Sequence, residues 1–383
     1  QPLRAELISA KPLTVKIINH FDFATFKDYE ILWTVEIDGK TAFSGNWEGD
    51  LAAGESIEVV LSGELPSSCE LGAYLNLSLV RKTSCSWAEA GYETALVQLE
   101  LPVGKQKKQR EVQEKTWEIQ EDSVFLKITD EQENGYQFHK IKGILTGIFK
   151  NGQNLLVSPT QLSLWRAPTD NERHMKTKWG LFEDNISGWN LNYLMDKCYS
   201  MEWEQKDHTV CVSVEGALAG ISRTPSSWYK ICYQICADGS LEVKVHAKMS
   251  KNKNAIWLPR FGFEFRVPYQ MEEMEYFGRG PWENYCDLYH HAPVGLYTSN
   301  ASREYFPYVK PQENGNHTKV KYLTVKNPHT GATLTFEAEK EMECQVLHYT
   351  KEELTEKKHY FELEENETTI RIDYKNSGIG SAS

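Results

Sequence analysis

The sequence lacks the features that mark several large classes of protein. It has no apolar run long enough to cross a bilayer, and its net charge of −12 argues against nucleic acid as a partner, because phosphate binding needs a basic face. Its eight cysteines form no CxxC pair. We therefore expect reduced thiols in a cytoplasmic protein that has no nucleic-acid or membrane partner.

Several chemical signatures are also missing. The histidines have no metal-ligand spacing, so we expect no metal site in this chain. No phosphate-binding loop and no GxSxG nucleophile motif occur. The sequence therefore gives no sign of a P-loop nucleotide-binding protein or of a serine hydrolase, and the function must be inferred from other patterns.

Short segments in which apolar and polar residues alternate recur along the chain and predict an all-β fold. Within residues 1–103, Ile31, Trp33 and Val35 alternate before Asp38-Gly39, a dipeptide typical of tight β-hairpins. Several short strands at this spacing predict an immunoglobulin-like β-sandwich.

The rest of the chain predicts a linker and a second, larger β domain. Residues 104–115 are charged and have no apolar face, which is typical of a linker. Over residues 116–383 alternation resumes, with an Asp238-Gly239 turn between two strands and one short helix expected over Lys351–His359. So many strands predict one large sheet-on-sheet domain. The chain begins Gln1-Pro2 and ends at Ser383, and we expect both ends to be cuts in a longer protein.

Three segments carry most of the chemical character. They are LWRAPTDNE (164–172), GRGPWENY (278–285) and YVKPQENG (308–315), and the last two belong to a stretch, 275–316, with little helical or strand period. Each combines a rigid Gly or Pro turn with charged and amide side chains, a composition that suits a sugar or a closely packed neighbouring domain. The plainer alternative is that Arg166, Asp170, Arg279 and Glu283 form ion pairs that pin long loops.

Two catalytic arrangements are open on the residues alone. Glu283 and Glu313 would serve as the two carboxylates of a glycosidase only at a set separation, which the sequence does not give. A mutarotase-like module would need His290 or His291 with Glu283 or Glu313 in one groove. A third alternative is a scaffold without a ligand, whose motif loops are joined by internal ion pairs.

Several segments resemble a known family in the right order. LWRAPTDNE, FGRGPWENYCD, YVKPQENGN and IDYKNSGIGS resemble the C-terminal region of the multi-domain β-galactosidases of glycoside hydrolase family 2. EILWTVEIDGK and SWAEAGYE resemble the domain that follows the catalytic barrel in those enzymes. The resemblance covers nearly the whole chain. It implies an immunoglobulin-like domain followed by a large β-supersandwich similar in fold to the galactose mutarotases.

The resemblance also implies a function. The chain would be the non-catalytic portion of an enzyme that hydrolyses terminal β-D-galactosides such as lactose, packing on a TIM barrel and completing the rim of the active site. The two catalytic glutamates would lie on that barrel, so we expect this chain alone to be inactive. The resemblance assigns no cofactor to this chain, and any divalent metal would belong to the catalytic domain. The intact protein would be a homo-oligomer, and the alternative is an autonomous carbohydrate-binding or aldose-mutarotase-like module.

Motif positions give the candidate site, without individual catalytic roles. We expect them to line the substrate rim or the face that meets the barrel: Arg166, Asp170, Asn171, Arg279, Trp282, Glu283, Asn284, Asp287, Tyr308, Gln312, Glu313 and Asn314. Trp282 stands where the family often has another residue, and would alter the shape of the rim.

Overall fold

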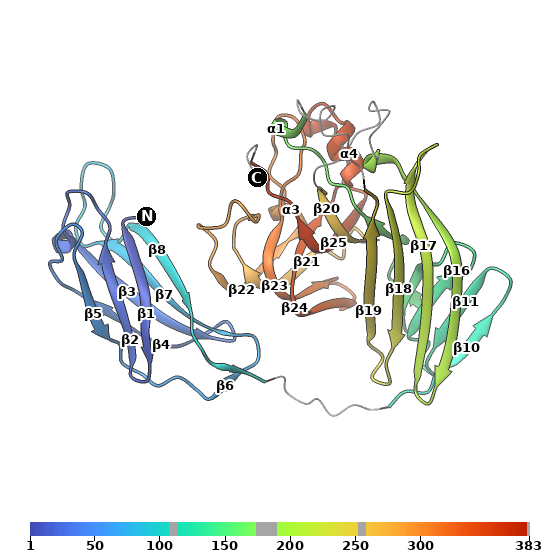
Figure 1. Cartoon of the computed structure of the whole chain (residues 1–383), viewed down its shortest axis with the longest axis horizontal. Coiled ribbons are helices and arrows are strands. Elements are labelled where there is room, and N and C mark those ends of the chain that lie inside the picture. Colours follow the sequence, from blue (N-terminus) through green and yellow to red (C-terminus); the bar gives the residue numbers. More distant parts are fainter. Residues whose placement is uncertain (107–113, 174–189, 252–257, 381–383) are drawn as a thin grey trace. The chain divides into compact units, whose positions relative to one another are not determined.

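The computed structural model describes residues 1–106, 114–173, 190–251 and 258–380. Contacts divide the chain into two compact units, which are described separately (Figure 1). The first comprises Gln1–Gln109, Tyr276–Pro281 and His290–Tyr297, and the second comprises Arg110–Glu275, Trp282–Tyr289 and Thr298–Ser383. Residues 107–113 of the predicted linker lie outside the described residues.

The first unit contains a three-stranded and a four-stranded antiparallel sheet. Their strand orders are β1-β2-β5 and β4-β3-β7-β8. The strands are β1 (Leu3–Ala10), β2 (Leu13–Asn19), β3 (Tyr29–Ile37), β4 (Lys40–Trp47), β5 (Ser56–Val60), β7 (Ala73–Arg81) and β8 (Glu93–Glu100). A short parallel pair, β6 (Ser68–Cys69) with β9 (Gly104–Lys105), and the 3-10 helix η1 (Phe26–Asp28) complete the unit.

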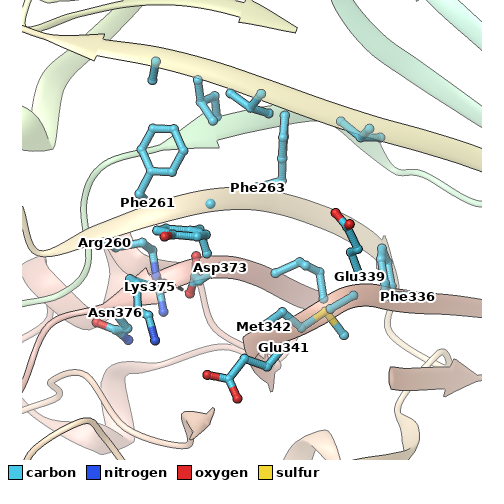
Figure 2. Close-up of a pocket in the computed structure, with 18 of the residues that line it drawn as sticks. Arg260, Phe261, Phe263, Phe336, Glu339, Glu341, Met342, Asp373, Lys375 and Asn376 are labelled. Carbon is cyan, nitrogen blue, oxygen red and sulfur yellow. Dashed lines mark ion pairs between the residues drawn. The ribbon is translucent and has the colours of Figure 1, made fainter. Parts of the chain in front are cut away.

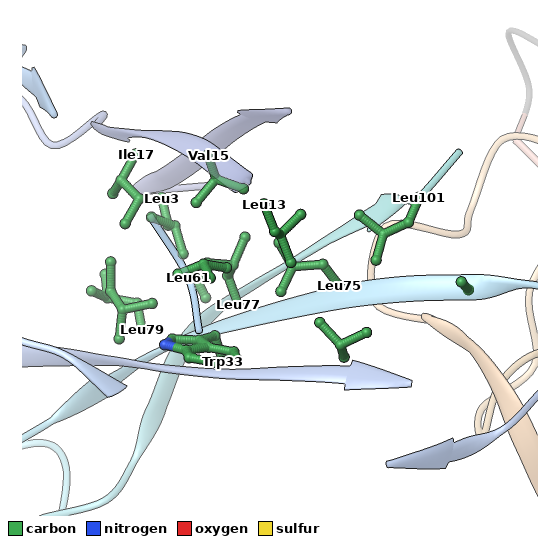
Figure 3. Packing of buried hydrophobic residues seen from close by; sticks show 14 of the residues in the cluster. Leu3, Leu13, Val15, Ile17, Trp33, Leu61, Leu75, Leu77, Leu79 and Leu101 are labelled. Atoms are coloured by element: carbon green, nitrogen blue, oxygen red, sulfur yellow. The ribbon is translucent and has the colours of Figure 1, made fainter. Parts of the chain in front are cut away.

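The two sheets enclose an apolar core. Val15 and Ile17 of β2 alternate inward and pack in one buried cluster with Trp33 of β3 and Leu77 of β7 (Figure 3). The predicted Asp38-Gly39 hairpin is confirmed: both residues have positive φ, 53° and 77°, and β3 pairs with β4. The alternating pattern of the sequence therefore identified this sandwich correctly.

Three antiparallel sheets build the second unit. Their orders are β10-β11-β12-β13-β14, β16-β17-β18-β19 and β15-β20-β25-β24-β23-β21-β22. The first sheet contains β10 (Glu118–Glu121), β11 (Phe125–Thr129), β12 (Gly135–His139), β13 (Ile144–Lys150) and β14 (Gln153–Asn154). The second contains β16 (Leu194–Lys206), β17 (Thr209–Gly220), β18 (Ser227–Ile235) and β19 (Leu241–Met249). The third contains β15 (Ser158–Ser163), β20 (Arg260–Pro268), β21 (Glu273–Arg279), β22 (Val294–Asn300), β23 (His317–Lys326), β24 (Thr333–Leu347) and β25 (Glu367–Asn376). The two segments that group with the first unit fall on β21, β22 and the residues beside them.

The helices of the described residues are short. Besides η1, they are α1 (Asp170–Arg173), α3 (Ala301–Glu304), α4 (Lys351–Glu356), η2 (Leu191–Tyr193) and η3 (Tyr360–Glu362). The helix predicted over Lys351–His359 is present but ends at Glu356, and it begins with a capping box between Thr350 and Glu353. In the described part of the chain no helix is both long and apolar enough to cross a membrane. All eight cysteines lie in that part and are free thiols.

The predicted all-β class is confirmed, and one local expectation needs correction. The stretch 275–316 is more regular than its composition suggested, because β22 and α3 lie inside it. Both are short, and Gly and Pro residues on either side interrupt any period that would reveal them.

Truncation of the first core tests this packing. Leu77 has 0% exposure, so Leu77→Ala should lower the free energy of unfolding of the first unit by about 3 kcal/mol through lost burial and a residual cavity. Val60→Ala is the matched control, because Val60 is 64% exposed on β5 and should change little. Denaturant titration followed by fluorescence measures both, and equal losses would contradict the assigned core.

Candidate functional site

The three motif segments meet over one face of the seven-stranded sheet in the second unit. This face is unusual because it is polar and yet buried: Arg260 and Glu264 of β20 and Arg371 and Asp373 of β25 are each 1% exposed. Burying charges is costly unless they are paired and hydrogen-bonded. The loops that cover this face supply the partners.

Arg166 joins the first motif to the end of β25. Its guanidinium donates to the carbonyl oxygens of Ser377 and Gly378, at 2.5 and 2.7 Å, and to Asn376 Oδ1 at 2.7 Å. It also forms an ion pair with Glu172 at 2.5 Å. Arg166 is 1% exposed and therefore anchors the loop from within.

Arg260 joins the third motif to the same strand. Its Nη2 lies 3.2 Å from Glu313 Oε1, and its Nε lies 2.8 Å from Asp373 Oδ2. Glu313 Oε1 also accepts hydrogen bonds from Gln345 and Asn376, at 3.0 and 3.2 Å. Two carboxylates thus share one guanidinium, and burial raises the pKa of Asp373 to about 6, with the charge of Arg260 opposing the shift and that of Glu313 adding to it.

Glu343 on β24 is a third buried carboxyl group in this network. It accepts from Asn316 Nδ2 at 3.2 Å and from the backbone N–H of Asn376 at 3.3 Å. Its nearest ion-pair partner, Lys375 Nζ, is 4.0 Å away. Burial consequently raises the pKa of Glu343 to about 7, although these hydrogen bonds favour the ionised form.

The second and third motifs are joined directly. Glu283 Oε2 accepts from the Gly315 N–H at 2.8 Å and its Oε1 accepts from the Tyr308 hydroxyl at 3.2 Å. Burial raises the pKa of Glu283, and these two donors offset part of the shift.

Asn284 continues this connection. Its Oδ1 accepts from both the N–H and the hydroxyl of Thr318, at 2.8 and 2.7 Å. Its backbone N–H donates to the carbonyl oxygen of Asn316 at 2.7 Å, and its own carbonyl oxygen accepts from Asn316 Nδ2 at 2.9 Å. Asn284 is 0% exposed, so these contacts fix the loop conformation.

The third motif is also tied to α1. Gln312 Oε1 accepts from the backbone N–H of Asp170 at 2.9 Å, and Asn314 Oδ1 accepts from the Phe306 N–H at 3.2 Å. Asp287 caps the end of the described chain by accepting from the N–H groups of Ile379 and Gly380, at 3.1 and 2.7 Å. These contacts place all three motifs in one hydrogen-bonded assembly.

Exposure separates the predicted site residues into three groups. Arg166, Asn284, Glu313 and Asn314 are buried; Arg279, Glu283, Tyr308 and Gln312 are half-buried; Asp170, Asn171, Trp282 and Asp287 are exposed. The structure brings these positions together, with the exception of Arg279, which ends β21 in a segment grouped with the first unit. The buried four contact other residues of the second unit.

The plainer ion-pair alternative is largely what the contacts support. Arg166 does pin a loop, but through Glu172 rather than Asp170, which instead lies 3.3 Å from Arg173. Glu313 holds Arg260 and is 3% exposed, which removes it as an accessible base or nucleophile. His290 and His291 are exposed at positions grouped with the first unit.

Sequence reasoning missed Arg260, Glu343 and Asp373. The alternation of Ile370, Ile372 and Tyr374 marked β25 correctly, but it did not reveal that the opposite, charged face is buried as well: Asp373 is 1% exposed, whereas Ile370 is 0% and Tyr374 72% exposed. The available signal was the segment IDYKNSGIGS, in which Asp373 and Asn376 stand among the motif positions that carry the family resemblance.

The opposite face of the same sheet borders a cavity of about 810 Å³. Figure 2 shows Phe261 and Phe263 of β20 among the residues that line it, together with Arg260 and Asp373. Gly262 permits this arrangement, because a Cβ there would lie 2.1 Å from Asp373 Oδ1. The side chains of β19 line one wall, and charged or polar residues of β20, β24 and β25, among them Arg260, Glu339 and Asp373, also line the cavity.

Metal binding has no support in the described ranges. No group of three or more His, Cys, Asp or Glu side chains is arranged there to hold an ion. What the polar face can do chemically is to fix loops in one conformation and to take up protons near neutral pH at Glu343 and Asp373.

Comparisons with known proteins identify both units. Residues 130–383 match the family model described as beta galactosidase small chain, and residues 15–102 match that described as beta-galactosidase, domain 4. A β-galactosidase of Actinobacillus pleuropneumoniae is 34% identical over 389 residues, which is 100% of this chain and 36% of that protein. One of Priestia megaterium is 26% identical over 383 residues, covering 99% of this chain and 36% of that protein. The chain thus spans little more than a third of the length of these relatives.

The first test at this site concerns Asn284. Asn284→Ala leaves the N–H and hydroxyl of Thr318 without their acceptor in a buried position, so the second unit should lose about 3 kcal/mol of stability. Asn171→Ala is the control: Asn171 is exposed on α1 and its loss should cost no more than about 0.5 kcal/mol. Chemical unfolding gives both values, and a loss of the same size in the two variants would refute the role given to Asn284.

The second test concerns Glu343 and pH. Its pKa is 4.5 in the unfolded chain and about 7 in the folded chain, so the folded state holds the extra proton between these values. The contribution of Glu343 to the free energy of unfolding is therefore fully present below pH 4.5 and is lost as the pH rises through about 7. Glu343→Gln cannot ionise, so from pH 5 to pH 8 the variant should lose about 2 kcal/mol less stability than the original chain.

Asp373, whose pKa is raised to about 6, contributes with the same sign in both chains, and its charge is one of the causes that raise the pKa of Glu343. Glu341→Gln, at an exposed position two residues away on β24, should leave the pH dependence unchanged. Urea unfolding at several pH values measures the difference, and parallel pH profiles for Glu343→Gln and the original chain would show that Glu343 ionises normally.

Proposed function

Because this chain belongs to the β-galactosidase small-chain family, we propose that it is the non-catalytic, C-terminal portion of a β-galactosidase. The intact protein hydrolyses terminal β-D-galactosides of the lactose type with retention, by means of two carboxylates on a TIM barrel outside these residues. The chain packs on that barrel and completes the rim of its active site.

The proposal rests on one observation: the carboxylates at the candidate site are engaged in ion pairs and hydrogen bonds within this chain. A retaining glycosidase needs two carboxyl groups about 5 Å apart on either side of an accessible glycosidic bond. In this chain Glu313 and Asp373 are buried against Arg260, and both oxygens of Glu283 accept hydrogen bonds from Gly315 and Tyr308. These groups hold loops in place, which supports a catalytic pair outside this chain.

The exposed parts of the same loops supply the contact surface. Trp282, Phe306 and Val309 are 69%, 58% and 76% exposed, and the loops that carry them are held in place by the buried network. Large apolar side chains that gather on a loop surface mark interaction sites. With Asp170, Asn171, Asp287 and the half-buried Glu283, Tyr308 and Gln312, they form the face that we assign to the barrel.

Cellular context follows from the same proposal. The free thiols suit a cytoplasmic protein, and a divalent metal, if the enzyme uses one, belongs to the catalytic domain. The intact enzyme is a homo-oligomer that acts on a carbohydrate substrate.

Complementation tests the proposal. Hydrolysis of a chromogenic β-galactoside is measured for this chain alone, for the separately produced remainder of the enzyme, and for a mixture of the two. We expect no turnover from this chain alone and a large gain on mixing. Turnover by the chain alone would overturn the proposal and return attention to Glu283.

Variants locate the contact face in the same assay. Trp282→Ala and Val309→Lys should each weaken complementation about tenfold, because each removes an apolar contact at the centre of the face. Ile221→Lys is the control, since Ile221 is 64% exposed on the turn after β17. Binding of sugar by the chain without any complementation would favour the autonomous carbohydrate-binding module instead.

A further inference from the structure

Strand β19 is a long sheet edge that the described residues leave open. It is the last strand of the four-stranded sheet, and within the described ranges its backbone pairs with β18 alone (Figure 1). Open edges of this length invite pairing with another strand, and proteins usually shorten or cover them.

The ladder with β18 determines which backbone groups face outward. The N–H of Ser250 donates to Ser226 O at 2.8 Å, and the N–H of Cys236 donates to Ser240 O at 2.9 Å. Even-numbered residues of β19 therefore bond to β18, because bonded and non-bonded pairs alternate in an antiparallel ladder. The N–H and C=O groups of Leu241, Val243, Val245, Ala247 and Met249 point to the open edge.

The side chains divide in the same way. The odd-numbered residues of β19 line the cavity, and Val243 is 41% exposed there. Those on the other face are exposed and charged or polar: Glu242, Lys244, His246 and Lys248. An occupant of this edge must therefore bring apolar side chains on one face and complementary charge on the other.

We propose that β19 of a second copy of this chain occupies the edge, in an antiparallel pair whose twofold axis passes through Val245. An axis through any residue of β19 pairs odd-numbered residues with odd-numbered ones, but an axis through Lys244 or His246 engages only seven of the nine residues, and the latter places Lys244 opposite Lys248. In this register all nine residues pair, and Glu242 lies opposite Lys248 of the other copy, twice per dimer. Val243 lies opposite Ala247, and Leu241 opposite Met249.

Other registers fit less well. An axis through Val243 engages only Leu241–Val245, and an axis through Ala247 places His246 opposite Lys248 with no acidic partner. At Val245 the Glu242 and Lys248 pairs occupy non-bonded positions, where facing side chains are closest. The apolar side chains of the two strands then form one continuous face, and Val243 and Ala247 lose their exposure to solvent. A twofold interface of this kind is self-complementary and closed.

A charge exchange tests the pairing, independently of the proposed function. The mass of the chain is measured by sedimentation over a range of concentrations, and we expect a reversible dimer. Glu242→Lys alone places lysines opposite each other, and Lys248→Glu alone places glutamates opposite each other, so each should weaken the dimer about tenfold or more. The double variant Glu242→Lys/Lys248→Glu should restore it.

Mixing gives the sharpest result. The two single variants repel themselves but complement each other, so an equimolar mixture should form heterodimers, which a size tag on one variant makes visible. Glu202→Lys, at an exposed position on β16 at the opposite end of the sheet, should leave the dimer unchanged. A monomer at every concentration, or a dimer that neither single variant weakens, would overturn the proposal and leave the edge to a segment of another chain.

Discussion

The contact between Arg260 and the two carboxylates of Glu313 and Asp373 is the constraint on which the second unit depends. All three side chains have lost nearly all contact with water, at a desolvation cost that only close pairing and hydrogen bonding repay. The partners come from β20, from the loop 308–316 and from β25. The desolvation cost is therefore offset only when these three segments pack together. Removing any one partner would leave a buried charge uncompensated, at a cost of about 3–5 kcal/mol.

This constraint gives the sheet two covered faces. The charged face of β20 and β25 is buried under loops, α1 and α4, and the opposite face packs Phe261 and Phe263 against the apolar core and borders the cavity. Glu264 illustrates how the charged face is maintained: burial opposes its ionisation, but Lys351, Arg371 and Arg266 outweigh burial and hold its pKa well below the usual range. Lys351 is the first residue of α4, so the helix is fixed to the sheet by charge.

The strands and the Asp-Gly turns could be predicted from the sequence because neighbouring residues determine them. Alternation identified strands throughout both units, and the two Asp-Gly turns were recognised because Gly adopts positive φ at no steric cost. The burial of the charged face of β25 was not predictable, because Arg371 and Asp373 find their partners in residues far away in the sequence, such as Glu264 and Arg260. Alternation reveals two faces of a strand, and only tertiary contacts decide whether each is covered.

The same distinction explains how much of the candidate site could be anticipated. Segments rich in Gly, Pro, amides and charges were expected to line one face, and the structure brings most of them together, but their composition did not separate the side chains that hold the loops in place from those that the loops expose. The buried Arg166 and Asn284 hold the loops in place, whereas Trp282 lies exposed on the surface of a loop. A surface built in this way takes its shape from ion pairs and hydrogen bonds beneath it, which are directional and permit little adjustment. Such a surface suits a partner that needs a rigid wall, and a catalytic domain whose substrate must be held in one orientation is a partner of that kind.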